Sequence, residues 1–162
     1  METTFQSKRI TTKLHSTYEQ FIDQLESTLT RIKPEDFNDL AKDPEKAKLH
    51  LEGLTGGDNL TILGSRPHGS LLKMIGIESK ATTYDIGNPL LVLNMTRNDI
   101  RVALYTPIRV LVYEDNNRQA FAAYDLPSFT LAQFQNDPII KTTELLDVLF
   151  DKLIRKVDEN HS

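Results

Sequence analysis

Cysteine is absent from this sequence of 162 residues, which excludes disulfides, thiolate zinc sites and cysteine nucleophiles. The four histidines, His15, His50, His68 and His161, are never three or four residues apart, so none of them forms a zinc-type pair. Oxygen-rich segments such as residues 115–117 lack the spacing of a calcium-binding loop. We therefore expect no bound metal ion.

Glycine-rich phosphate loops are absent as well. The sequence contains neither GxGxxG nor GxSxG, and residues 55–58 lack the Lys-Ser or Lys-Thr pair that completes a P-loop. These absences argue against ATP-binding, dinucleotide-binding and α/β-hydrolase functions. We therefore expect no cofactor.

A basic excess and long apolar runs are the other missing features. The formal net charge is −4 and the pI is about 5.6, whereas a nucleic-acid-binding surface usually needs a basic face. No apolar run approaches the ~20 residues that span a bilayer, and the first 14 residues lack the apolar core of a signal peptide. We expect a cytoplasmic protein with neither nucleic acid nor membrane as a partner.

What the sequence does contain is concentrated in residues 84–126. Asn88 and Pro89 open a helix there, because asparagine is a favoured N-cap and proline fits the first helical position. The first two turns of this helix are almost all apolar, so we expect it to be buried nearly all round over residues 88–98. A β-hairpin is predicted to follow, with strands at residues 108–114 and 118–125.

The turn of this hairpin decides which side chains face the core. A two-residue type I′ turn at Asn116 and Asn117 would pair Val112 with Phe121. The expected core face then carries Ile108, Val110, Val112, Phe121 and Ala123. The opposite face, which is only half polar, carries Arg109, Leu111, Tyr113, Ala120, Ala122 and Tyr124. A three-residue turn would move Phe121 to the opposite face, since a slip of one residue inverts every side chain.

The two ends of the chain are expected to form an edge strand and two amphipathic helices. Residues 4–14 alternate weakly and include charges, as an edge strand does. Ser16 and Glu19 form a predicted capping box before an amphipathic helix over residues 17–32. Residues 139–157 place apolar side chains along one stripe of a long final helix.

The order of elements indicates the fold class. Short strands are expected at residues 60–63 and 78–84, which gives the order β-α-β-β-α-β-β-α with short helices in the connections. Such an order favours an α+β fold, an antiparallel sheet covered by helices. We expect a single domain over residues 1–162, with a helical insertion at about residues 34–53.

Two segments carry a resemblance to a known family. GNPLL at residues 87–91 and ALYTPIRVLVYE at residues 103–114 resemble the bacterial and archaeal domain-of-unknown-function 302 family. The resemblance implies a TBP-like β-α-β4-α domain with no established activity, so it carries over no catalytic residue. Members of the family often have Asp-His-Gly where this chain has Pro67, His68 and Gly69, so the acid of that motif is missing here.

One predicted loop, residues 64–70, has a composition that goes beyond turn chemistry. It places Ser65, Arg66, His68 and Ser70 ahead of a short predicted helix, whose free N–H groups and dipole favour an anion. The guanidinium of Arg66 suits a carboxylate or phosphate, and a histidine such as His68 is a residue type that can transfer protons. The loop is therefore a candidate anion site, a candidate catalytic site with His68 as general acid or base, or an exposed connector.

The half-apolar face of the hairpin is the second candidate. It is explained by self-association through a two-fold interface, by a ligand pocket in which Arg109 is the charged anchor, or by cover from the helical insertion. The function we expect is a non-enzymatic homodimeric module that binds a small anionic or amphipathic molecule. The alternatives are a cofactor-free enzyme that uses His68 near Arg66, and a purely structural or partner-binding module.

Overall fold

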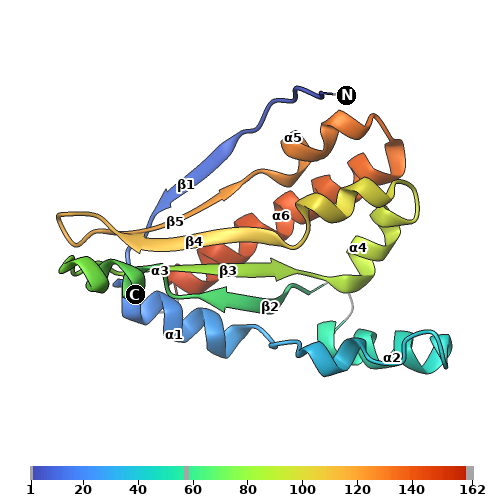
Figure 1. The fold of residues 1–162 in the computed structure, drawn as a ribbon, viewed down its shortest axis with the longest axis horizontal. Helices are drawn as coiled ribbons and strands as arrows, with labels where there is room; N and C mark the ends of the chain where they lie inside the picture. Colours follow the sequence, from blue (N-terminus) through green and yellow to red (C-terminus); the bar gives the residue numbers. More distant parts are fainter. Residues whose placement is uncertain (1, 57–58, 160–162) are drawn as a thin grey trace.

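The structure is a computed structural model that describes residues 2–56 and 59–159. Its centre is a five-stranded antiparallel sheet in the order β1-β5-β4-β3-β2 (Figure 1). The strands are β1 (Arg9–Lys13), β2 (Thr61–Arg66), β3 (Ala81–Gly87), β4 (Ile108–Glu114) and β5 (Ala120–Asp125). The predicted α+β class and antiparallel sheet are confirmed.

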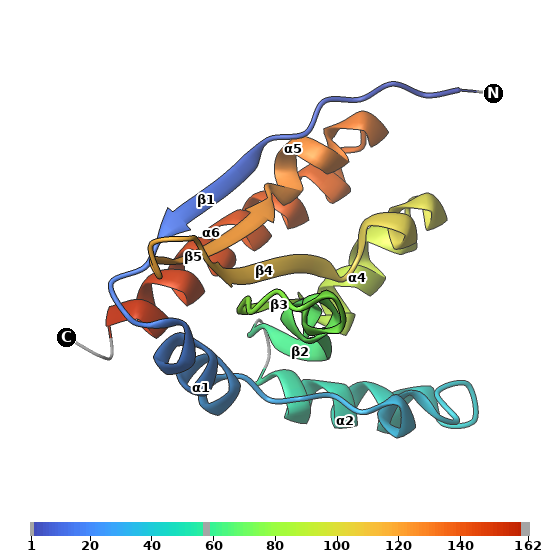
Figure 2. The same ribbon diagram turned by 60° about the vertical axis from the view of Figure 1, so that its left-hand side comes forward.

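Helices occupy every connection except the β4–β5 hairpin. The α-helices are α1 (Tyr18–Thr28), α2 (Pro44–Thr55), α3 (His68–Leu72), α4 (Pro89–Thr96), α5 (Pro127–Leu131) and α6 (Asp137–Glu159). The 3₁₀ helices are η1 (Pro34–Phe37), η2 (Lys73–Ile75), η3 (Ile100–Tyr105) and η4 (Ala132–Phe134). The long helix α6 runs behind the sheet in Figure 1, whereas α2 lies beyond the β2 edge in both Figure 1 and Figure 2.

The core lies between one face of the sheet and the helices α1, α4 and α6. The strands contribute the buried side chains of Ile62, Tyr84, Ile86, Ile108, Val110, Val112, Ala120, Ala122 and Tyr124. The helices contribute those of Phe21, Leu25, Leu91, Met95, Ile139, Leu146, Phe150, Leu153, Ile154 and Val157. Each large side chain buried in this way contributes about 1.5–3 kcal/mol to the free energy of unfolding, so this layer dominates the stability of the fold.

The β4–β5 hairpin has a three-residue turn. The N–H of Asp115 donates to the carbonyl of Gln119 (2.9 Å), and Arg118 adopts the left-handed conformation at φ 62°. The carboxylate of Asp115 accepts from the N–H groups of Asn117 and Gln119, at 2.8 and 2.9 Å. A type I turn followed by a left-handed residue is the common three-residue hairpin, and Asp115 stabilises it here.

The predicted two-residue register was therefore wrong by one residue. Phe121 and Ala123 leave the predicted core face. Ala120, Ala122 and Tyr124 enter the core instead. The ring of Tyr124 packs 5.2 Å from that of Phe150 on α6. This contact joins residues far apart in the sequence, so the sequence of the turn does not predict it.

The face of the sheet that points away from α1 and α6 is called the outer face here. It consists of Arg9, Thr11, Lys13, Gly64, Arg66, Ala81, Thr83, Asp85, Arg109, Leu111, Tyr113, Phe121, Ala123 and Asp125. The segment formed by α3 and η2 borders this face along β3. Gly69 lies so close to β3 that a Cβ atom there would be 2.2 Å from the carbonyl oxygen of Ser79, so only glycine permits this approach.

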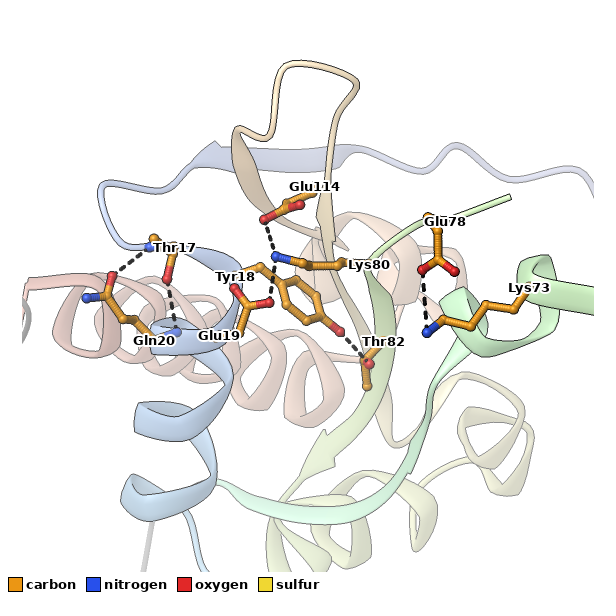
Figure 3. A network of polar contacts seen from close by, with 9 residues as sticks. All are labelled: Thr17, Tyr18, Glu19, Gln20, Lys73, Glu78, Lys80, Thr82 and Glu114. Carbon is orange, nitrogen blue, oxygen red and sulfur yellow. Dashed lines mark hydrogen bonds and ion pairs between the residues drawn. The ribbon is translucent and has the colours of Figure 1, made fainter. Parts of the chain in front are cut away.

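Polar contacts hold the start of α1 against the sheet (Figure 3). The ammonium of Lys80 lies 2.6 Å from Glu19 on α1 and 3.0 Å from Glu114 on β4, and the hydroxyls of Tyr18 and Thr82 are 2.7 Å apart. Hydrogen bonding to Glu19 and Glu114 raises the pKa of Lys80. The same bond to Lys80 lowers the pKa of Glu19.

A buried carboxylate ties the β1–α1 connection to the end of α6. Asp158 accepts from the N–H groups of His15 and Ser16 and from the Ser16 hydroxyl, at 2.8–3.0 Å. Burial by itself would raise the pKa of Asp158, but these donors together hold that pKa below its ordinary value. Because Ser16 is used in this way, the N-cap of α1 is Thr17 with Gln20 as the reciprocal partner. The predicted capping box of Ser16 and Glu19 was wrong by one residue.

Helix α4 is shorter and more exposed than predicted. Asn88 caps it and Pro89 occupies its first turn, as expected. Leu91 and Met95 are buried, but the side chain of Leu93 is 58% exposed, so the predicted burial all round was wrong. Among residues 2–56 and 59–159, no helix has both the length and the apolar character needed to cross a bilayer.

Candidate functional site

The segment 64–70 is not a loop in the structure. Strand β2 continues through Arg66, because Gly64 pairs with Asp85 and Arg66 with Thr83 on β3. Helix α3 then starts at His68, so Ser70 lies inside the helix rather than capping it. The expected geometry, a loop aimed at the start of a helix, was wrong. Binding of an anion by this segment stays a prediction without that support.

Two of the predicted site residues are nevertheless brought together on the outer face. Asp85 lies 2.8 Å from the guanidinium of Arg66 and 3.8 Å from that of Arg109. Gly64 leaves room for this carboxylate, since a Cβ atom there would lie 3.2 Å from Asp85 Oδ2. Each arginine therefore already has an anionic partner within the protein.

The other predicted residues do not join this cluster. Ser65 pairs with Tyr84 and points to the opposite side from Arg66, where its hydroxyl lies 3.4 Å from Arg31. The ring of His68 is exposed and contacts the hydroxyl of Thr83 at 3.1 Å. General acid–base catalysis needs a positioned group in a closed pocket, and the exposed ring of His68 lacks those surroundings.

A cleft that sequence reasoning missed lies on the other side of the molecule. It has a volume of about 430 Å³ and is enclosed by the ends of α1 and α2 and by α6. Its apolar lining consists of Leu29, Leu54, Leu60, Leu149 and Leu153. Its polar lining consists of Thr28, Thr30, Thr55, Asn59, Lys152 and Lys156. The volume is within the range of pockets that bind small molecules.

Backbone pairing closes one side of this cleft. The chain that leaves α1 runs beside β2, where the N–H of Ile32 donates to the carbonyl of Ile62 and the N–H of Ile62 donates to that of Thr30, both at 2.9 Å. The segment next to Leu29 is thereby attached to the sheet. The wall that faces α6 is therefore hydrogen-bonded to the sheet at this end.

The charge in the cleft comes from α6. Lys152 and Lys156 lie one turn apart on its exposed side, beside the apolar Leu149 and Leu153. Within the part of the chain that the structure describes, neither lysine forms an ion pair, whereas Lys80 pairs with two carboxylates. The i, i+4 spacing of these lysines next to an apolar stripe is visible in the sequence. The position of the ends of α1 and α2 opposite these lysines is not visible in the sequence.

A second hollow, of about 580 Å³, lies between the N-terminal segment, η3 and η4. Its cation is Arg101, which already lies 2.6 Å from Asp99 and stacks over the ring of Phe134 at 5.5 Å. Among the described residues that line this hollow, no cation without an anionic partner is therefore available to bind an anion. The cleft beside α6 is the better candidate.

Comparison with known proteins supports the fold and the family. The model of the domain of unknown function DUF302 matches residues 38–159. A crystal structure of an uncharacterized conserved DUF302 protein from Bacillus stearothermophilus superposes with a TM-score of 0.62 at 12% sequence identity. The match covers 93% of this chain and 95% of that one. No curated protein matches the sequence. Because the family model covers most of the chain and the resemblance seen at residues 87–91 and 103–114 falls within it, the chain belongs to the DUF302 family.

Proposed function

We propose that this protein is a non-enzymatic binding module that holds a small amphipathic anion in the cleft between α1, α2 and α6. The observation that carries the proposal is the pairing of an apolar lining with two lysines that have no carboxylate partner among the described residues. An apolar pocket with a few placed polar groups is the usual form of a small-molecule site.

The positions of the polar groups define the orientation of the ligand. The last residues of α1 and α2, Thr28 and Thr55, line the cleft, and the final carbonyls of a helix are acceptors at the negative end of its dipole. An anionic group is therefore disfavoured on that side. It belongs next to Lys152 and Lys156, with the apolar part of the ligand on the leucines.

The lining also supports a binding role over a catalytic one. Its described residues are threonine, leucine, glycine, asparagine and lysine, without histidine or a carboxylate. A general acid or base that works near neutral pH is usually one of the missing types. A ligand held here would be bound and released unchanged.

Thermal unfolding with octanoate as the probe tests the proposal. Octanoate should raise the free energy of unfolding by about 2.7 kcal/mol when its concentration is a hundred times its Kd. The double variant K152Q/K156Q should lose most of this gain. K141Q, an exposed lysine on the same helix but outside the cleft, should keep it.

Further probes and variants distinguish binding in this cleft from binding elsewhere on the protein. Octanol should stabilise weakly because it lacks the charge, and inorganic phosphate should stabilise weakly because it lacks the apolar chain. An effect of octanoate that survives K152Q/K156Q but disappears in R66A would place the anion on the outer face. Equal effects in K152Q/K156Q and K141Q would contradict the proposal.

A further inference from the structure

The outer face combines apolar side chains with an open surface. Leu111, Tyr113, Phe121 and Ala123 are neighbours on β4 and β5, and the rings of Tyr113 and Phe121 stack at 5.4 Å. Only part of this face is bordered by helix, along β3. Within the single chain Leu111, Tyr113 and Phe121 are half-buried and Ala123 is buried, so the patch exposes a moderate apolar area. Contiguous apolar areas on a surface often mark a contact.

The bordering segment of α3 and η2 extends the patch. Leu71, Met74, Ile75 and Ile77 have side chains that are 63%, 83%, 71% and 48% exposed. They follow one another closely in the sequence, so they lie together beside the outer face. A group of large exposed apolar side chains in one short segment favours a contact surface there.

One end of the outer face carries a row of charges that alternate from strand to strand. Across β1, β5, β4 and β3 the residues are Arg9, Asp125, Arg109 and Asp85. Arg109 and Asp125 are neighbours because they lie one residue beyond the paired Val110 and Tyr124. Two contacts within the row are ion pairs, Arg9 with Asp125 at 2.9 Å and Arg109 with Asp85 at 3.8 Å.

This order of charges is complementary to itself. A two-fold axis that lies in the plane of the face, parallel to the strands and midway between β5 and β4, reverses the order of the row. Arg9 then meets Asp85 of the partner subunit, and Asp125 meets Arg109 of the partner subunit. Within this row every cation faces an anion, and such self-complementarity favours an isologous interface.

The same axis also matches the apolar rows. It places Tyr113 opposite Phe121 of the partner subunit and Leu111 opposite Ala123 of the partner subunit. The α3–η2 segment, which borders β3, comes next to the β1 side of the second copy. We propose that the outer face binds a second copy of this chain, so that two sheets pack face to face in a homodimer.

This inference does not rest on the proposed ligand. The cleft is formed by α1, α2 and α6, and the outer face points away from α1 and α6. K152Q/K156Q should therefore abolish binding of octanoate without changing the mass in solution. A negative result for ligand binding in the cleft would not contradict the dimer, and a negative result for the dimer would not contradict ligand binding.

Sedimentation equilibrium at micromolar concentration measures the outcome directly. The wild type should have twice the chain mass of 18.5 kDa. R109D places an aspartate opposite Asp125 of the partner subunit, and D125R places an arginine opposite Arg109 of the partner subunit. Each variant alone should weaken the dimer at least about tenfold. Circular dichroism verifies that both variants keep the helix content of the wild type.

An equal mixture of the two variants gives the decisive result. In a mixed dimer, the aspartate introduced by R109D faces the arginine introduced by D125R, and the native Asp125 and Arg109 face each other. The mixture should therefore restore the dimer that each variant alone weakens. V148E serves as a control, since Val148 is 48% exposed on α6, on the opposite side of the sheet from the outer face, and it should remain dimeric. A monomeric wild type overturns the proposal, as does a mixture that stays as weak as its components.

Discussion

The two faces of the sheet are built from the same strands and differ in what orders them. On the core face, side chains such as Val110, Val112 and Ala122 are fully buried beneath helices. On the outer face, their sequence neighbours Arg109, Leu111 and Ala123 lie in rows of charged and apolar groups, where Arg109 is exposed and Leu111 is half-buried. Burial of apolar side chains stabilises the core face, whereas the outer face carries charges of alternating sign. Substitutions on the two faces should therefore change the free energy of unfolding by different amounts.

The sharpest test of this difference uses two tyrosines on adjacent strands. Tyr124 is 4% exposed and packs on Phe150, so Y124A should lower the free energy of unfolding by about 3–5 kcal/mol. Tyr113 is only partly covered by Phe121 on the outer face, so Y113A should cost about 1 kcal/mol or less when both variants are measured at a protein concentration low enough to keep the chain monomeric. Urea denaturation followed by circular dichroism measures both, and similar losses would contradict the assignment of faces.

The next effect concerns the carboxylate that joins the β1–α1 connection to α6. D158A removes the acceptor of three buried or partly buried donors and should cost about 2–3 kcal/mol. The loss should appear as a lower denaturation midpoint. A change below about 0.5 kcal/mol would show that solvent replaces Asp158 without penalty.

Acid adds a second measurement on the same residue. The pKa of Asp158 is lowered in the folded protein, so its contribution to stability is present above the unfolded pKa of about 4 and is lost as the pH falls through the folded pKa. The difference in stability between wild type and D158N should therefore shrink as the pH falls below about 4. A difference that stays constant over this range would mean that the ionised form is not what the structure stabilises.

A smaller effect is expected where α3 contacts the outer face. In G69A the new methyl group would collide with the Ser79 carbonyl, so α3 must move, at a cost of about 1–3 kcal/mol. Hydrogen exchange of the α3 amides should become faster. G53A is the matched control, because Gly53 is a helical glycine of α2 with open space around it, and it should gain about 0.5–1 kcal/mol.

The smallest effect belongs to the ion pairs at the rim of the core face. K80M removes the contacts to Glu19 and Glu114, but the lysine side chain is 41% exposed and solvent screens both pairs. The loss should stay below about 1 kcal/mol and decrease further in salt. A loss as large as that of D158A would show that these exposed pairs act like buried ones.

Local signals in the sequence determined much of the fold. The apolar spacing of residues 17–32 and 139–157 predicted α1 and α6, and Asn88 with Pro89 predicted the start of α4. The order of elements then indicated an antiparallel α+β sheet, and residues 87–91 and 103–114 indicated the family. These features depend on groups a few residues apart, so a single sequence contains them.

Only the tertiary structure decided the two candidate surfaces. Asn116 and Asn117 are compatible with both a two-residue and a three-residue turn. A shift of one residue moves every side chain of the second strand to the opposite face of the sheet. In the structure, the three-residue turn places Tyr124 against Phe150 on α6. In the same way, Gly64 and Arg66 continue a strand because β3 supplies backbone partners, where composition suggested a loop. The cleft needs the ends of α1 and α2 to meet Lys152 on α6, far away in the sequence. Contacts over such distances follow from the packing of the whole chain, which local patterns do not contain.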